Sequence, residues 1–262
     1  MKQITYLIVN TVTLVVVLLV NYLSGTGAIN GQSVGEVSAQ YESLFTPAGY
    51  AFGIWGPIYL LLIAFVGYQW YAWLKRKDDH ELKKTGVWFA LSNLVNSAWI
   101  YAWLHEYIGI SVLLTSLLLV LLIVLMFRLR LETWDAPLRT IVFVWWPICI
   151  YLGWIIVATV ANYAIFFIFL GWNKGVMSEE QWTIIMLVAS AIIYLLLIVY
   201  RNMREAALVG TWAFVAIALK QWQANDFVAW TALIVAIILF LAVSYHGYKN
   251  KDTSPFVKLK QR

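Results

Sequence analysis

One long apolar stretch limits the folds open to this chain more than any other feature. No charged residue stands between Arg139 and Lys174, whereas a helix needs only about 20 apolar residues to cross the hydrocarbon of a bilayer. Inside a bilayer the backbone must satisfy its own hydrogen bonds, so this stretch predicts a membrane-spanning helix. Its excess length predicts that the helix tilts, kinks near Pro147 or projects past the membrane.

The rest of the chain has the same character. Hydrophobic residues make up 63% of the 262 residues and charged residues 12%, whereas soluble domains are about half apolar and a quarter charged. Eight segments are long and apolar enough to be transmembrane helices. We predict an all-α fold, a polytopic transmembrane helix bundle with spans over residues 4–24, 50–74, 86–105, 108–128, 139–169, 181–200, 206–222 and 227–247.

The basic residues of the loops predict the orientation of the bundle. Cytoplasmic loops of membrane proteins are enriched in Lys and Arg. With the N-terminus inside, all eighteen Lys and Arg residues except Lys174 and Lys220 fall on the cytoplasmic side. Both termini are therefore expected to be cytoplasmic, and the pattern suits a bacterial plasma (inner) membrane. The net charge of +5 is spread over helix ends and indicates no nucleic-acid partner.

The predicted spans lack the groups that most membrane catalysis and ion coupling require. No Asp or Glu lies in the middle of a span, although ion-coupled transporters place ionisable groups there. The chain has no serine-hydrolase, zinc-protease, phosphate-loop or Cys-x-x-Cys motif. We therefore expect no catalytic residue, no metal and no cofactor, but an aromatic interior suited to a large flat apolar ligand.

One face of the span 139–169 carries side chains that lipid contact does not require. Tyr151, Trp154, Ala158 and Asn162 follow one another at steps of three, four and four residues, so a helix aligns their side chains on one face. They offer a phenol, an indole, a small side chain that leaves a gap, and an amide. Such a face suits the wall of a pocket, but small and polar residues also line ordinary helix contacts in membranes, and both interpretations stay open. The span 86–105 presents Asn96, Trp99 and Trp103 in the same way.

The first outer loop, residues 25–49, carries no Lys or Arg. Within it, Ser33 to Phe45 could form a short amphipathic helix that ends before Thr46 and Pro47. A long loop beside a helix bundle acts either as a lid over a binding site or as a solvated connector.

Three segments carry aromatic, proline and amide residues in a characteristic order. They are TPAGYAFGIWGPIY (46–59), LSNLVNSAW (91–99) and PICIYLGWIIVATVAN (147–162). Together they resemble the proline-rich loop, the asparagine-bearing third helix and the fifth helix of the translocator protein / tryptophan-rich sensory protein family (TspO/MBR). The resemblance implies a five-helix bundle with a pocket under the first loop, which in that family binds porphyrins, haem-pathway intermediates, sterols and benzodiazepine-type drugs.

The resemblance also implies a ligand site. Trp55 and Trp154 match the family's pocket tryptophans, Asn96 matches its pocket asparagine, and Ala158 matches a small residue where bulk would fill the cavity. The implied ligand-binding residues are Trp55, Tyr59, Asn96, Trp99, Tyr151, Trp154, Ala158 and Asn162, with Phe45 and Pro47 in the lid.

The chain departs from the family pattern in its lid and in its length. Phe45 replaces a usual Trp, and the interval from Gly53 to Trp55 is one residue short, which predicts a rotation of Trp55 by about 100°. The last three spans have no counterpart in a five-helix family, and could replace a homodimer interface, bind a partner or close the side of the pocket. The expected domains are a TspO-like ligand-binding bundle over 1–172, a three-helix extension over 173–248 and a basic cytoplasmic tail over 249–262.

The function implied by the resemblance is that of an integral membrane sensor or receptor for tetrapyrroles or similar flat hydrophobic ligands. The alternatives are a transporter of such ligands and a structural or assembly subunit of a larger membrane complex. Some family members have been proposed to degrade porphyrin in light, so a weak Trp-dependent activity is the one enzymatic role implied. The expected partners are a porphyrin or sterol-like ligand, the lipid bilayer, and a second copy or membrane complex at the last three spans.

Overall fold

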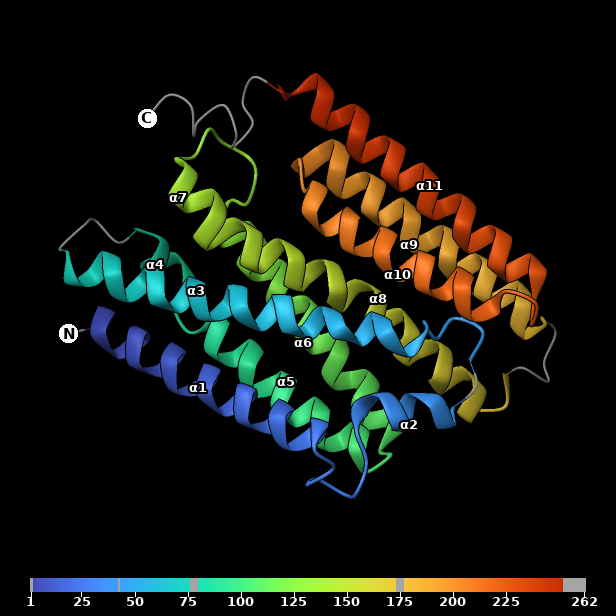
Figure 1. Cartoon of the computed structure of the whole chain (residues 1–262). Helices are drawn as coiled ribbons and strands as arrows, with labels where there is room; N and C mark the ends of the chain where they lie inside the picture. Colours follow the sequence, from blue (N-terminus) through green and yellow to red (C-terminus); the bar gives the residue numbers. More distant parts are fainter. Residues whose placement is uncertain (1, 42, 76–79, 173–176, 252–262) are drawn as a thin grey trace.

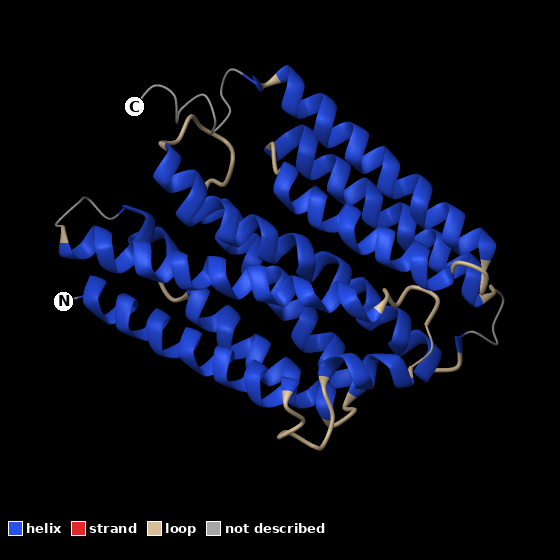
Figure 2. Ribbon diagram, viewed as in Figure 1, coloured by secondary structure: helices blue, strands red, loops and turns tan. Residues whose placement is uncertain are grey.

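The described part of the chain is a bundle of helices. The computed structural model describes residues 2–41, 43–75, 80–172 and 177–251, and among these no strand occurs, which confirms the all-α prediction (Figures 1 and 2). Five short elements join the long helices: α2 Val34–Gln40, the 3-10 helix η1 Gly49–Ile54, α4 His80–Thr85, α7 Leu138–Thr140 and the π-helix η2 Ile141–Trp145. The long helices are α1 Lys2–Gly25, α3 Trp55–Leu74, α5 Trp88–Leu104, α6 Ile108–Leu129, α8 Trp146–Phe169, α9 Glu179–Arg201, α10 Arg204–Gln221 and α11 Asp226–Lys249.

Six segments of the described chain are long and apolar enough to cross a membrane. They coincide with six of the eight predicted spans, whereas α5, with 17 residues, and α10, with charged residues in its first and last turns, fall outside this set. Spans over 86–105 and 206–222 therefore stay predictions. The six segments are Gln3–Gly25, Gly49–Leu74, Ile108–Leu129, Leu138–Phe169, Glu179–Arg201 and Asp226–Lys249.

The long helices form two groups that meet along α8. In Figure 1, α1, α3, α5, α6 and α8 make one group and α9, α10 and α11 the other, and α10 packs along α8. A Cβ added at Gly153 would lie 2.8 Å from the Cα of Ala206, so the backbones of α8 and α10 approach closely there. Small residues permit this approach, as they do between membrane helices in general.

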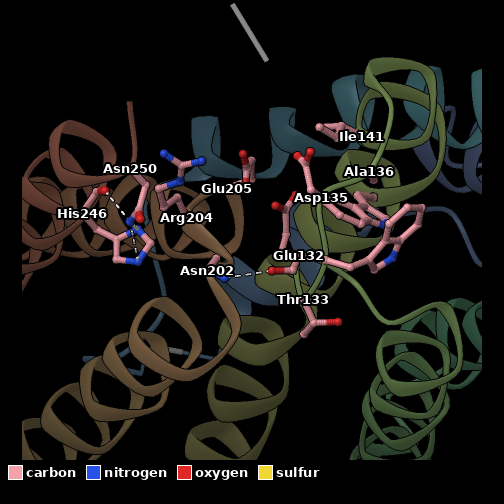
Figure 3. A pocket seen from close by; sticks show the side chains of 12 residues that line it. Glu132, Thr133, Asp135, Ala136, Ile141, Asn202, Arg204, Glu205, His246 and Asn250 are labelled. Atoms are coloured by element: carbon pink, nitrogen blue, oxygen red, sulfur yellow. Dashed lines mark hydrogen bonds between the residues drawn. The ribbon is translucent and has the colours of Figure 1, made fainter. Parts of the chain in front are cut away.

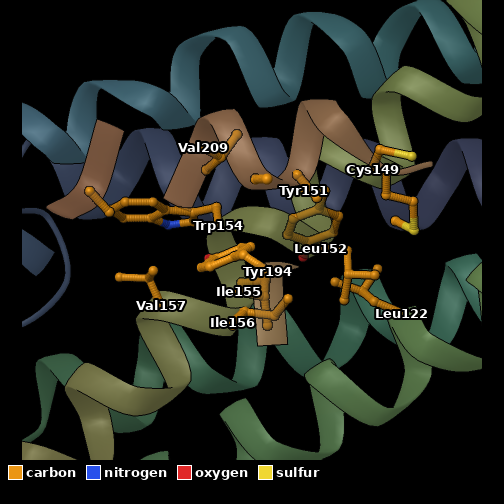
Figure 4. Packing of buried hydrophobic residues seen from close by; sticks show 14 of the residues in the cluster. Leu122, Cys149, Tyr151, Leu152, Trp154, Ile155, Ile156, Val157, Tyr194 and Val209 are labelled. Carbon is orange, nitrogen blue, oxygen red and sulfur yellow. The ribbon is translucent and has the colours of Figure 1, made fainter. Parts of the chain in front are cut away.

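A π-helix interrupts the long apolar stretch just before Pro147, while the expected tilt, kink or projection past the membrane stays a prediction. The π-helix η2 precedes α8, and Pro147 occupies the first turn of α8, where its missing N–H costs little. A π turn allows the axis to adjust before the straight part of the helix begins. The residues that follow, from Ile148 to Ile165, are largely buried and form the centre of the core (Figure 4).

The helix predicted in the first loop is shorter than expected. Ser33 caps α2 through a capping box, in which its Oγ accepts from the Glu36 N–H at 3.2 Å and its own N–H donates to the Glu36 carboxylate. α2 ends at Gln40 and not at Phe45, because Tyr41 already has extended backbone angles. The chain then turns inward, and Phe45 is fully buried in the core.

The beginning of α1 and the end of α11 lie at the same end of the bundle (Figure 1). This arrangement agrees with an even number of long helices, while the orientation of the bundle in a membrane stays a prediction. Several predicted topology signals, namely Arg76, Lys77, Lys174 and the basic tail beyond residue 251, lie outside the described residues.

Candidate functional site

A small aromatic cavity lies beneath α2, at the end of the bundle away from the two termini. Its volume is about 40 Å³. Four tryptophans from three helices contribute to its wall, and α2 and the loop after it form its roof. The lining residues are Val34, Ser38, Pro47, Phe52, Trp55, Trp99, Trp103, Trp154, Val157, Ala158, Ala161, Asn162 and Ile165.

Many of the predicted site residues meet at this cavity. The rings of Trp55 and Trp154 are perpendicular, with centroids 6.4 Å apart, so the expected rotation does not remove Trp55 from the pocket. Phe52 from η1 adds a second edge-to-face contact to Trp154 at 5.9 Å. Of the predicted set, the residues that line the cavity are Trp55, Trp99, Trp154, Ala158 and Asn162, together with the lid residue Pro47.

Three further predicted residues lie behind Trp55 and do not line the cavity. The Tyr59 ring stacks on Trp55 at 5.3 Å, and the Tyr151 ring meets Trp55 edge-on at 5.9 Å. Both hydroxyl groups face the Asn96 amide. Among the described residues, however, neither hydroxyl group and neither polar atom of Asn96 has a partner in hydrogen-bond geometry. Buried polar groups in this state are rare in native structures and are costly to keep, so they call for an explanation.

Trp103, which the sequence analysis placed on one face with Asn96 and Trp99 but not among the implied ligand-binding residues, lines the cavity, whereas Phe45 of the roof does not. Trp103 stacks on Trp99 at 5.9 Å and its Nε1 donates to the carbonyl of Val34 in α2 at 3.1 Å. Its helical spacing from Trp99 is the sequence signal for this position. Phe45, predicted in the lid, is buried in the core beside the cavity and does not line it, because the chain turns inward after α2.

Some residues of the predicted face also serve helix packing. Asn162 Oδ1 accepts a hydrogen bond from Ser111 Oγ of α6 at 2.8 Å, so this amide holds two helices together as well as lining the cavity. Ala158 contributes space, since a larger side chain there would fill a cavity of this size. This face of α8 therefore both packs against α6 and lines the cavity.

The roof of the cavity is tied to the bundle on both sides. On the α5 side, Asn30 Nδ2 donates to the Leu104 carbonyl at 2.7 Å, and the Tyr41 hydroxyl donates to the Glu106 carboxylate at 2.9 Å. Partial burial and the Glu106 carboxylate raise the pKa of Tyr41 to about 12. These bonds join the roof at the rim, where water competes, so each is worth little by itself.

The three-helix group holds the second half of the roof. The backbone N–H of Leu44 donates to the Glu179 carboxylate of α9 at 2.9 Å, and that of Ala48 donates to the Ala216 carbonyl of α10 at 3.1 Å. No residue of α9, α10 or α11 is among those lining the cavity. In the described structure these helices therefore position the roof from outside and do not form the wall.

The comparisons with known proteins agree with this architecture. The family model described as TSPO-like protein matches residues 7–245, from the first turns of α1 to near the end of α11. No curated protein and no solved structure matches the chain. The match covers most of the chain, including the three-helix group, and the apolar helices fit a protein embedded in a bilayer. The chain is therefore an integral membrane protein that belongs to the TSPO-like protein family.

Proposed function

We propose that this protein is a membrane receptor that binds a tetrapyrrole, or a similar flat hydrophobic ligand, in the cavity beneath α2. The observation that carries the proposal is the convergence of Trp55, Trp99, Trp103 and Trp154 on one cavity. Aromatic rings bind flat apolar molecules through stacking and edge-to-face contacts. The tryptophans come from α3, α5 and α8, so their meeting is a property of the tertiary structure and not of one helix.

The cavity is too small for such a ligand in this structure, and binding requires its roof to move outward. Pockets for drug-sized ligands measure roughly 300–1,000 Å³, whereas this cavity holds about 40 Å³. The roof is the part suited to move, because α2 has only seven residues and its region is joined to α5 and the loop after it by the hydrogen bonds of Asn30, Val34 and Tyr41. The ligand then selects the open state, and its affinity is reduced by the cost of opening.

The polar atoms behind Trp55 give the open pocket its hydrogen-bonding groups. The Asn96 amide and the Tyr59 and Tyr151 hydroxyl groups face one another without a well-formed hydrogen bond, and the ring of Trp55 separates them from the cavity. When a ligand moves that ring aside, these donors and acceptors reach the ligand's polar edge. Their unmet hydrogen bonds are then satisfied by the ligand, which favours binding.

The orientation of the pocket follows from the predicted topology. Loops rich in Lys and Arg lie at the other end of the bundle, so the positive-inside rule places the cavity on the outer side of the membrane. We propose a bacterial plasma membrane, with both termini cytoplasmic. A second copy of the chain, or another membrane protein, would then dock on the lipid-facing side of the three-helix group.

The test is a titration of detergent-purified protein with protoporphyrin IX, followed by quenching of tryptophan fluorescence. We expect saturable quenching at micromolar porphyrin, and an affinity at least about tenfold weaker in the Trp55→Phe/Trp154→Phe double variant. A Trp222→Phe/Trp230→Phe variant is the matched control, because it also removes two tryptophans, which form a separate pair at 5.3 Å between the residue after α10 and α11.

Free tryptophan titrated in parallel corrects for light absorbed by the porphyrin. Equal affinity in the two double variants, or quenching no greater than that of free tryptophan, would contradict the proposal. A loss of affinity confined to the Trp55/Trp154 variant would support it.

A further inference from the structure

Residues 43–54, which we call the connecting segment, lie between the aromatic cavity and the three-helix group. On the cavity side, Pro47 and Phe52 are lining residues, and the Phe52 ring meets Trp154 edge-on at 5.9 Å. On the other side, the backbone N–H groups of Leu44 and Ala48 donate to α9 and α10. The connecting segment therefore has one face on the cavity and one face on the three-helix group.

Trp212 of α10 holds the connecting segment with its side chain. Its Nε1 donates to the backbone carbonyl of Ala51 at 3.3 Å, and its ring meets the Tyr50 ring edge-on at 5.1 Å. Both contacts fall on η1, the 3-10 helix that also carries Phe52. Trp212 itself is not among the residues that line the cavity, so its effect on a ligand there passes through the residues that it contacts.

The two faces of the connecting segment are joined by very short stretches of backbone. Pro47 precedes Ala48, and Ala51 precedes Phe52, and neighbouring Cα atoms lie only about 3.8 Å apart. The ring of Pro47 fixes its φ angle, and η1 is a tight 3-10 helix, so little conformational freedom remains to absorb a shift. A displacement of the cavity face is therefore transmitted to the face on α10, and the reverse also holds.

The α2 half of the roof is held by a different part of the bundle. Hydrogen bonds of Asn30, Val34 and Tyr41 join it to α5 and the loop after α5, whereas the hydrogen bonds of the connecting segment go to α9 and α10. The part of the roof that moves outward is thus distinct from the part that the three-helix group holds. The connecting segment is the fixed wall against which a ligand is placed.

We propose that Trp212 is a positioning residue for ligand binding, and that the connecting segment couples occupancy of the cavity to the three-helix group. The inference rests on the proposed function for its ligand. By holding η1, Trp212 keeps Phe52 edge-on to Trp154 before the ligand arrives, so less binding free energy is lost in ordering the wall. Such coupling is reciprocal, so the bound ligand strengthens the attachment of the wall to α10. The three-helix group is then the part of the receptor that responds to the ligand.

The first experiment needs no ligand. It compares hydrogen–deuterium exchange in the full chain and in Trp212→Phe, both in detergent, by mass spectrometry. Phenylalanine retains a ring opposite Tyr50 but lacks the N–H that donates to Ala51, and Trp212 is 40% exposed, so the variant should fold. We expect the amides of residues 44–54 to exchange at least about threefold faster, with those of α2 unchanged.

Asn202→Gly is the matched control for this exchange experiment. At the opposite end of the bundle, Asn202 Nδ2 donates to the Glu132 carbonyl at 2.8 Å, beside a cavity of about 230 Å³ (Figure 3). This bond attaches the connection between α9 and α10 to the loop after α6, and glycine tolerates the φ of 56° at this position. Asn202→Gly should leave the exchange of residues 44–54 unchanged.

The second experiment measures protoporphyrin IX binding from the shift of its main absorption band, which does not depend on the number of tryptophans. Trp212→Phe should weaken the affinity about fivefold, whereas Trp230→Phe in α11 should not alter it. The double variant Trp212→Phe/Phe52→Leu should lose less affinity than the product of the two single losses, because both residues act through one wall. In the unmodified protein, saturating porphyrin should slow the exchange of residues 44–54 and of α10.

Unchanged exchange of residues 44–54 in Trp212→Phe, or equal acceleration in Asn202→Gly, would contradict the role of Trp212. Porphyrin binding that leaves exchange in residues 44–54 and α10 unaltered would contradict the coupling, as would single losses that multiply in the double variant. Failure of the proposed function has a different signature, in which no porphyrin binds to the unmodified chain although Trp212→Phe still exchanges faster. That result would overturn the coupling to a porphyrin and retain the attachment of η1 to Trp212.

Discussion

The hydroxyl group of Tyr194 in α9 donates a 2.6 Å hydrogen bond to the backbone carbonyl of Gly153 in α8. The Tyr194 ring lies over Gly210 of α10, where an added Cβ would come within 2.5 Å of a ring carbon. One side chain thus spans three helices and attaches the three-helix group to α8, beside the pocket residue Trp154. The attachment depends on two glycines. Gly210 leaves space for the Tyr194 ring, and Gly153 lets the backbone of α10 approach α8.

Gly210→Ala should destabilise the protein, because its Cβ would overlap the Tyr194 ring. Overpacking of this kind costs about 1–3 kcal/mol. The measurement is thermal unfolding in detergent, followed by circular dichroism. Gly67→Ala is the matched control, since nothing lies within 4 Å of its Cβ in α3, and alanine raises helix stability by about 0.5–1 kcal/mol. Equal melting temperatures for the two variants would contradict the assigned role of Gly210.

Asn96→Leu should leave stability unchanged or raise it, because it removes two buried polar atoms that make no well-formed hydrogen bond among the described residues. The same variant should weaken protoporphyrin binding, since the open pocket loses its amide. Denaturant unfolding and the porphyrin titration measure the two effects. Asn93→Leu is the control, because Asn93 Nδ2 donates to Thr13 Oγ1 at 3.4 Å and its loss should lower stability. A large loss of stability in Asn96→Leu would contradict the prediction.

Ala158→Phe should block the aromatic cavity. The added ring exceeds the space of about 40 Å³ and would occupy the position where a ligand stacks on Trp154. We expect protoporphyrin affinity to fall at least about tenfold, with an overpacking cost of about 1–3 kcal/mol. The titration is accompanied by gel filtration to confirm the fold. Full affinity in a folded Ala158→Phe protein would place the porphyrin elsewhere.

High pH should loosen the roof through Tyr41. Its pKa is raised to about 12 by burial and by Glu106, so the protonated phenol is favoured in the closed state. The stabilisation is complete below the ordinary tyrosine pKa of about 10 and is lost as the pH rises toward 12. Proteolysis of the 26–41 segment, measured from pH 9 to 11.5, should accelerate over this range. Tyr41→Phe should abolish that part of the pH dependence, and an identical profile in the variant would exclude Tyr41 as its source.

The sequence by itself determined the elements of this protein and one face of its site. The apolar length of 139–169 specifies a helix because hydrophobicity and backbone hydrogen bonding act locally. Helical periodicity alone aligns Trp154, Ala158 and Asn162, and all three line the cavity. The resemblance of short segments to a known family then placed Trp55 at the same site.

Only the tertiary structure decided which helix faces are in contact and how large the cavity between them is. Phe45 enters the core and Tyr59 lies behind Trp55, because contacts between distant segments decide such positions and local patterns do not encode them. The Tyr194 ring lies over Gly210, and no spacing in the sequence predicts that contact. The small size of the aromatic cavity likewise results from how the finished helices pack, through close approaches such as that of Gly153 to Ala206.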